Sequence, residues 1–119
     1  MKSGIIYIAD NLFETILASS FEEQQRGLMY LDPPVPVMSF LYPNSQINKF
    51  WMKNTKAPLD IVFSNNGIIT QICKGEPYST AVIGDDKLSD LIVELPYGTV
   101  FKLGIKLGNK LGLVKSSIK

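Results

Sequence analysis

Turn-forming residues recur in this sequence at intervals of roughly 8 to 12 residues, which limits the elements between them to short strands and short helices. The strongest turn signal is Asn65-Asn66-Gly67, which is typical of a type I′ hairpin. Asp10-Asn11 and Gly108-Asn109 mark two further turns. This spacing predicts a mainly β fold. We expect a compact antiparallel or mixed barrel or sandwich of short strands, with two short helices at about residues 20–30 and 98–103.

Residues of high strand propensity, mainly β-branched and aromatic, fill most of the segments between the turns. The two segments on either side of Asp10-Asn11 predict a hairpin. Residues 43–46 are expected to form a loop, residues 74–89 a long surface loop, and residues 115–119 a frayed tail. The predicted strands are residues 4–9, 12–18, 37–42, 50–54, 59–63, 68–73, 91–95 and 111–114.

A capping box predicts where the first helix begins. Ser20 stands three residues before Glu23, so each side chain can accept a hydrogen bond from the backbone N–H of the other residue. We expect this helix to run from residue 21 to about residue 30, and a second one to occupy residues 99–103. The residues that the first helix is expected to bury are Phe21, Leu28 and Met29.

Length and charge narrow the class of protein. The 119 residues suit one domain, residues 1–119, and the formal net charge of +1 argues against nucleic acid as a partner. No apolar run reaches the roughly 18 residues that a membrane helix needs, so no membrane association is expected. The first apolar run is too short for a signal peptide, and the single cysteine, Cys73, excludes an intramolecular disulfide. A cytoplasmic location is therefore the default expectation.

The sequence contains no histidine. This absence removes the usual general base at neutral pH, the commonest metal ligand, and every nucleophile that depends on a histidine. We therefore expect no metal, no cofactor and no catalytic residue. An enzyme built from this chain would need Asp60 or Glu94 as acid or base, with Lys53 as the electrophilic stabiliser.

The most informative stretch is residues 49–63, which holds the only tryptophan of the chain. If residues 50–54 form a strand whose Phe50 and Met52 face the core, Trp51 points outward between Lys49 and Lys53. An indole with two cations at its rim suits stacking of a planar or anionic group. Alternatively, the long loop partly covers Trp51 and the lysines only solvate it.

Asp60 lies between Leu59 and Ile61, at the edge of the predicted core, where a carboxylate needs a partner. We expect that partner to be the backbone N–H groups of residues 54–56 or the side chain of Arg26. Asp60 is then a structural anchor, and the alternative is a base or a wall of a pocket. Arg26 could also clamp Glu94 or a ligand.

Several short motifs occur in an order that resembles a known family, domain of unknown function 192. They are Arg26-Gly27-Leu28-Met29, Phe50-Trp51-Met52-Lys53-Asn54-Thr55, Pro58-Leu59-Asp60-Ile61-Val62-Phe63, Gly67-Ile68, Glu94-Leu95-Pro96 with Gly98, and Leu103-Gly104-Ile105-Lys106-Leu107-Gly108. The resemblance spans nearly the whole chain and implies a small, mostly β domain, often found behind a signal peptide. It implies no reaction. Lys49 departs from the family pattern, in which a small polar residue or histidine often precedes Phe50.

The sequence therefore favours a non-catalytic binding module over an enzyme, with a small polar molecule or a peptide as the partner. A third hypothesis is an interaction module that offers an exposed strand edge to another chain. The predicted ligand-binding residues are Trp51, Lys53, Asn54, Thr55, Asp60, Arg26 and Glu94.

Overall fold

The two turns with the clearest signals both form hairpins in the computed structural model, which describes residues 1–116. The strands β1 (Lys2–Ile8) and β2 (Asn11–Ala18) pair antiparallel. The strands β4 (Leu59–Asn65) and β5 (Ile68–Gly75) do the same. Between them Asn66 and Gly67 have φ values of 50° and 82°, as a type I′ turn requires. Both predicted hairpins are confirmed.

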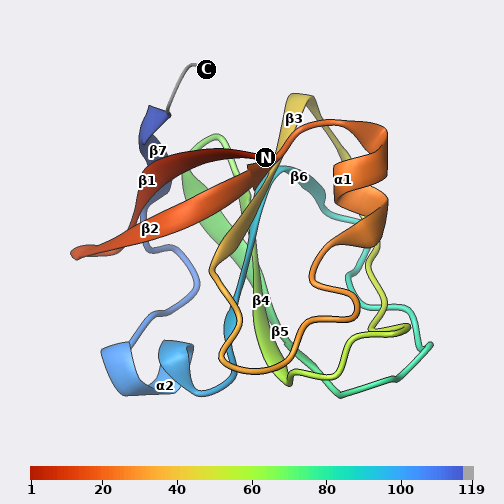
Figure 1. Cartoon of the computed structure of the whole chain (residues 1–119). Helices are drawn as coiled ribbons and strands as arrows, with labels where there is room; N and C mark the ends of the chain where they lie inside the picture. Colours follow the sequence, from red (N-terminus) through yellow and green to blue (C-terminus); the bar gives the residue numbers. More distant parts are fainter. Residues whose placement is uncertain (117–119) are drawn as a thin grey trace.

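These hairpins belong to one seven-stranded mixed sheet within the described residues, in the order β5-β4-β6-β3-β2-β1-β7 (Figure 1). The remaining strands are β3 (Met38–Ile47), β6 (Leu88–Pro96) and β7 (Leu111–Ser116). Among the strand pairs of residues 1–116, only β2 and β3 run parallel, and the crossover between them contains the helix α1 (Phe21–Arg26). The predicted mainly β class is confirmed, although the sheet is not closed into a barrel.

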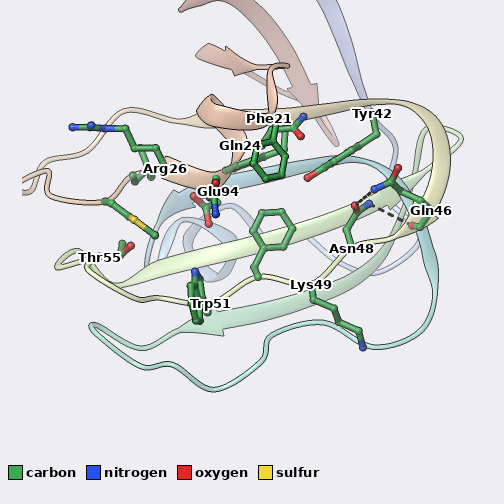
Figure 2. A pocket seen from close by; sticks show the side chains of 16 residues that line it. Phe21, Gln24, Arg26, Tyr42, Gln46, Asn48, Lys49, Trp51, Thr55 and Glu94 are labelled. Atoms are coloured by element: carbon green, nitrogen blue, oxygen red, sulfur yellow. Dashed lines mark hydrogen bonds between the residues drawn. The ribbon is translucent and has the colours of Figure 1, made fainter.

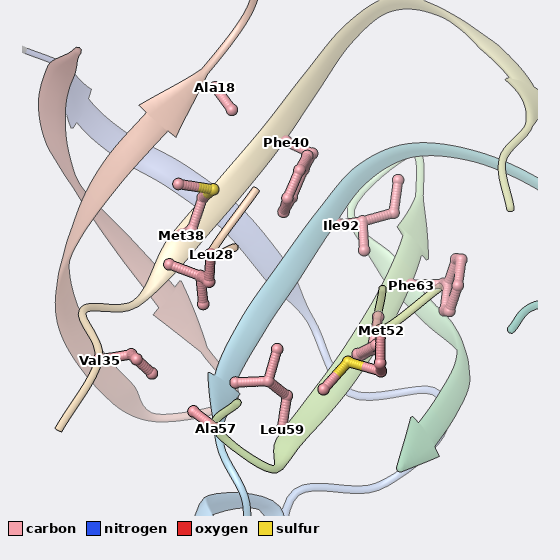
Figure 3. Packing of buried hydrophobic residues seen from close by; sticks show 11 residues of the cluster. Ala18, Leu28, Val35, Met38, Phe40, Met52, Ala57, Leu59, Phe63 and Ile92 are labelled. Carbon is pink, nitrogen blue, oxygen red and sulfur yellow. The ribbon is translucent and has the colours of Figure 1, made fainter. Parts of the chain in front are cut away.

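The centre of the sheet has a core on each face. Antiparallel pairing sets Ile61 opposite Glu94 and Asp60 opposite Leu95, and successive side chains point to opposite faces. One core, shown in Figure 3, contains Ala18, Leu28, Val35, Met38, Phe40, Met52, Ala57, Leu59, Ile61, Phe63 and Ile92. The other contains Ile6, Ile8, Val62, Ile69, Val93, Leu95, Ile105 and Leu111.

The first helix is shorter than predicted. The capping box of Ser20 and Glu23 forms, but α1 ends at Arg26 because Gly27 takes a positive φ of 52°. Leu28 is buried as expected, whereas Phe21 is 76% exposed, so its predicted burial is wrong. The reason is that Phe21 is the first residue of a helix with no buried residue, which lies on the surface.

The segment that holds Trp51 is not a strand. Phe50 makes a single bridge to Ile83, and the chain then turns at Asn54, which has a φ of 55°. The turn is closed by the Thr55 N–H, which donates to the Met52 carbonyl. The predicted strand at residues 50–54 is wrong because no continuous partner strand lies beside it. The predicted loop at residues 43–46 is also wrong, since β3 continues through it.

The last part of the chain follows the prediction more closely. The helix α2 spans Thr99–Leu103, as expected, and lies at the other end of the molecule from α1 (Figure 1). Residues 115 and 116 extend β7, and the rest of the predicted frayed tail, residues 117–119, lies outside the described residues. No helix within residues 1–116 has both the length and the apolar character needed to cross a membrane.

Candidate functional site: a cleft with a buried carboxyl group

A cleft of about 360 Å³ opens between α1, strands β3 and β6, and the Trp51 segment (Figure 2). Its lining combines aromatic side chains, amides and a few titratable groups. The lining residues are Phe21, Gln24, Gln25, Arg26, Gly27, Leu28, Met29, Phe40, Tyr42, Gln46, Asn48, Lys49, Phe50, Trp51, Thr55 and Glu94. Most of them come from segments that neighbour each other only in the folded chain.

Glu94 is the buried acid of this cleft. It lies on β6, paired with Met38 of β3 and Ile61 of β4, and only 4% of its surface is exposed. Gly27 lies beside it, because a Cβ added at Gly27 would stand 3.7 Å from the Glu94 Oε1 atom, at ordinary contact distance. The sheet therefore places a carboxyl group where the bulk solvent barely reaches.

The Glu94 carboxyl group has no partner among residues 1–116. No hydrogen bond or salt bridge within that range involves it. Every fully enclosed side-chain nitrogen or oxygen of the described residues has a hydrogen-bond partner. It follows that the Glu94 oxygens keep some accessible surface, and the cleft that Glu94 lines is where that surface opens.

Burial decides the protonation of Glu94. Loss of hydration disfavours the charged form and raises the pKa of Glu94 to about 8. Burial also raises the pKa of Tyr42 to about 12, and the nearby Glu94 charge acts in the same direction. Near neutral pH both groups are therefore mostly protonated, so each can donate a hydrogen bond, and Glu94 can also release its proton to meet a ligand.

Aromatic rings form part of the wall. The Phe40 and Phe50 rings meet edge to face with centroids 5.0 Å apart, and Phe50 meets Phe63 in the same way at 5.6 Å. Trp51 remains 46% exposed, and the Lys53 ammonium group stands 5.1 Å from the indole centroid. Such rings offer flat apolar contact, and they attract a cation at their faces.

The amide side chains of the cleft are fixed by hydrogen bonds to the protein. The Gln24 Nε2 donates to the Ala18 and Leu41 carbonyls, at 3.1 and 2.8 Å. Gln46 donates to the Asn48 Oδ1 at 2.8 Å, as Figure 2 shows, and Asn48 donates in turn to Ser89. These amides therefore hold α1 and the end of β3 in place beside the cleft.

The cleft's own cations are engaged away from Glu94. The Arg26 guanidinium lies over the Tyr30 ring, 5.8 Å from its centroid. The Lys49 Nζ donates to the Gly84 carbonyl at 3.1 Å and pairs with Asp86 at 3.0 Å. Figure 2 shows the Arg26 and Lys49 side chains extending outward from the centre of the cleft. The possible clamp of Arg26 on Glu94 or Asp60 is therefore not made.

Four of the predicted ligand-binding residues line the cleft together: Arg26, Trp51, Thr55 and Glu94. Two others, Lys53 and Asn54, are not part of the lining. Lys53 stacks against Trp51, and the Asn54 side chain donates to the Tyr30 hydroxyl at 2.8 Å. Tyr42 and Phe50 also line the cleft but were not among the predicted site residues. Tyr42 could have been found by strand alternation, because it follows Met38 and Phe40 at a period of two.

Asp60 does not belong to this cleft. It lies on the opposite face of the sheet from Glu94, where its Oδ2 accepts hydrogen bonds from the Gly98 and Val100 N–H groups at 3.1 and 2.9 Å. The expected partners, residues 54–56 or Arg26, were therefore wrong. Because the sheet separates them, Asp60 and Glu94 cannot share one reaction site.

The described residues contain no group of three or more histidine, cysteine, aspartate or glutamate side chains that could hold a metal ion. The cleft is lined by one carboxylic acid, Glu94, together with amide and aromatic side chains. These groups can form hydrogen bonds, ion pairs and stacking contacts.

The fold of this chain is similar to that of two crystal structures. One, from Sinorhizobium meliloti 1021, is described as a "putative transcription regulator". It is 30% identical with a TM-score of 0.87, and the match covers 95% of this chain and 94% of that one. The other is a protein of unknown function from Novosphingobium aromaticivorans DSM 12444. It is 27% identical with a TM-score of 0.86, covering 92% and 84% of the two chains.

No curated protein matches the chain. The model of one family, DUF192, described as "Uncharacterized ACR", matches residues 5–113. That range includes every strand from β2 to β6, both helices and the whole of the cleft. The chain belongs to the DUF192 family.

Proposed function

We propose that this protein is a binding module, and that the cleft above Glu94 receives a small polar molecule. The observation behind this proposal is the carboxyl group of Glu94, which has no partner within residues 1–116, is only 4% exposed and lines the cleft. Burying a carboxyl group without a partner costs free energy, which a bound ligand can recover. A buried acid kept open to a cleft is therefore better suited to meeting a ligand than to stabilising the fold.

Binding fits the cleft better than catalysis does. A general acid or base usually works with a second group on the same reacting atoms. The acid that could have formed a pair, Asp60, is on the other face of the sheet, and Lys53 stacks on Trp51 outside the lining. Glu94 is thus left as a recognition group with aromatic walls around it.

The test is a screen of small amines, alcohols, amides and carboxylates by ¹⁵N-resolved NMR. We expect at least one class to shift the amide signals of Glu94, Tyr42 and Trp51 as a group. Trp51→Ala should weaken that ligand about tenfold, since it removes part of the wall. The same variant should stay folded because Trp51 is half exposed.

Phe101→Ala is the matched control. Phe101 is an aromatic residue of α2, 93% exposed and absent from the lining of the cleft. The Phe101→Ala variant should bind the ligand as the wild type does. If no class of compound shifts the cleft signals, or if Phe101→Ala weakens binding as much as Trp51→Ala, the cleft is not the binding site.

A further inference from the structure

We propose that the ligand of this cleft is a small organic amine, bound as an ammonium ion whose nitrogen meets the Glu94 carboxylate. This inference rests on the proposed binding function and adds the chemical class of the ligand. Three features of the cleft support it. No cation of residues 1–116 pairs with Glu94, aromatic side chains form part of the wall, and Glu94 is the group of the lining that exchanges a proton in the neutral pH range.

The first feature is the missing counter-ion. A buried carboxylate is normally paired with a cation or with backbone amides, as Asp60 is with Gly98 and Val100. Within residues 1–116 Glu94 has neither, although Arg26 and Lys49 line the same cleft. Both of those cations have other partners, namely the Tyr30 ring and Asp86. A ligand can therefore supply the cation that pairs with Glu94.

The second feature is the wall around that place. Phe40, Phe50 and Trp51 all line the cleft with Glu94. Ring faces attract an ammonium group electrostatically, whereas they do not favour an anion. A volume of about 360 Å³ accommodates a small molecule with an apolar body. The aromatic rings and the Glu94 carboxylate thus both favour a positively charged ligand.

The third feature concerns the proton. Arg26 of α1, Tyr42 of β3 and Lys49 of the segment after β3 are the other charged or titratable groups in the lining. The pKa of Tyr42 is raised to about 12, so Tyr42 keeps its proton throughout the neutral range. Glu94 is thus the group of the lining that exchanges a proton there. When an ammonium ion binds, Glu94 releases one proton to the solvent and the ion pair forms.

The experiment compares three probes of one shape: phenethylammonium, 2-phenylethanol and 3-phenylpropanoate. Each is titrated by NMR against the full chain at about pH 6, 7 and 8. An alkylammonium ion keeps its charge in this range, because its pKa resembles that of lysine at about 10.4. We expect phenethylammonium to bind best, with an affinity that rises about tenfold from pH 6 to pH 7, since only ionised Glu94 accepts it. Binding of the alcohol should not follow pH.

The decisive variant is Glu94→Gln, which keeps the shape of the side chain but cannot ionise. It should weaken phenethylammonium at least tenfold and remove the dependence on pH. Glu14→Gln is the matched control, because Glu14 is exposed on β2 and lies outside the cleft. The wild-type pH profile tests the inference even if Glu94→Gln folds poorly.

Two results would overturn the inference. One is phenethylammonium binding that is independent of pH. The other is equal or tighter binding of the alcohol or the carboxylate at the same cleft signals. In either case the binding function stands and the amine class is wrong. If phenethylammonium does not bind at all, the inference also fails. The binding function then fails with it only if the wider screen leaves the cleft signals unchanged.

Discussion

At the scale of single residues, the two buried acids within residues 1–116 show how neighbours decide the role of a side chain. Asp60 and Glu94 are 6% and 4% exposed, on adjacent strands. Asp60 receives two backbone N–H groups and anchors the start of α2. The Glu94 carboxyl group receives none from residues 1–116, and its pKa rises to about 8. The same chemical group is hydrogen-bonded to the backbone in one place and opens to a cleft in the other.

This difference predicts how stability depends on pH. The pKa of Glu94 rises from an ordinary 4.5 to about 8 on folding. Between these values the folded protein holds a proton that the unfolded chain has lost. The contribution of Glu94 to stability is therefore complete below about pH 4.5 and is lost as pH rises toward 8. The slope is at most about 1.4 kcal/mol per pH unit.

Glu94→Gln should remove that slope, because a glutamine does not titrate. The free energy of unfolding, measured in urea at several pH values, should favour the variant over the wild type increasingly as pH rises. Glu14→Gln should instead run parallel to the wild type, since Glu14 is exposed. A constant difference between the Glu94→Gln and wild-type curves would falsify the assignment of the raised pKa to Glu94.

At the scale of elements, α2 is held in place by its contacts with the sheet more than by its own helical structure. α2 has five residues and no side-chain cap, and Gly98 before it has a φ of 97°. So short a helix is marginal in water on its own. The Asp60 carboxylate joins it to β4 through the Gly98 and Val100 N–H groups. This link, together with the packing of Ile105, holds residues 98–105 against the second core.

Asp60→Ala should therefore loosen α2 while leaving the cleft intact. Removal of the Asp60 carboxylate leaves the Gly98 and Val100 N–H groups without this acceptor. We expect this to lower the free energy of unfolding by about 1 to 3 kcal/mol. Hydrogen exchange at the Gly98 and Val100 amides should become faster. Asp60→Asn keeps an acceptor oxygen and should cost less. If Asp60→Ala instead weakened ligand binding at unchanged stability, Asp60 would be a ligand-binding residue after all.

At the scale of the whole molecule, β4 and β6 join two cores into one structure. Leu59 and Ile92 belong to the core beneath the cleft, and Val62 and Leu95 belong to the core on the other face. The same strands therefore take part in both, and β4 is buried from Leu59 to Ser64. A core substitution on one face of the sheet should therefore also destabilise the core on the other face.

Leu59→Ala and Leu95→Ala test this coupling from opposite faces. Each should lower the free energy of unfolding by about 2 to 5 kcal/mol, because each opens a cavity at a fully buried site. Each should shift the unfolding curve measured by Trp51 fluorescence together with the curve measured by circular dichroism. Separate transitions for the two probes in either variant would show that the cores unfold independently.

The sequence alone was sufficient wherever the determining interactions are local. The turn at Asn66 and Gly67 depends on two residues that tolerate positive φ, and the capping box depends on Ser20 and Glu23. The mainly β class follows from many such local signals. The start of α1 was predicted for the same reason, and the bounds of α2 were predicted from Gly98 and Gly104 on either side of it.

Tertiary structure decided what depends on residues far apart in the chain. Residues 50–54 have strand composition, but their partner is one residue, Ile83, and the chain turns at Asn54 instead. Which face each acid occupies was also open, because side chains alternate with a period of two and the register is set by pairing with a distant strand. Only the pairing of β4 with β6 put Asp60 beneath α2 and Glu94 beneath the cleft.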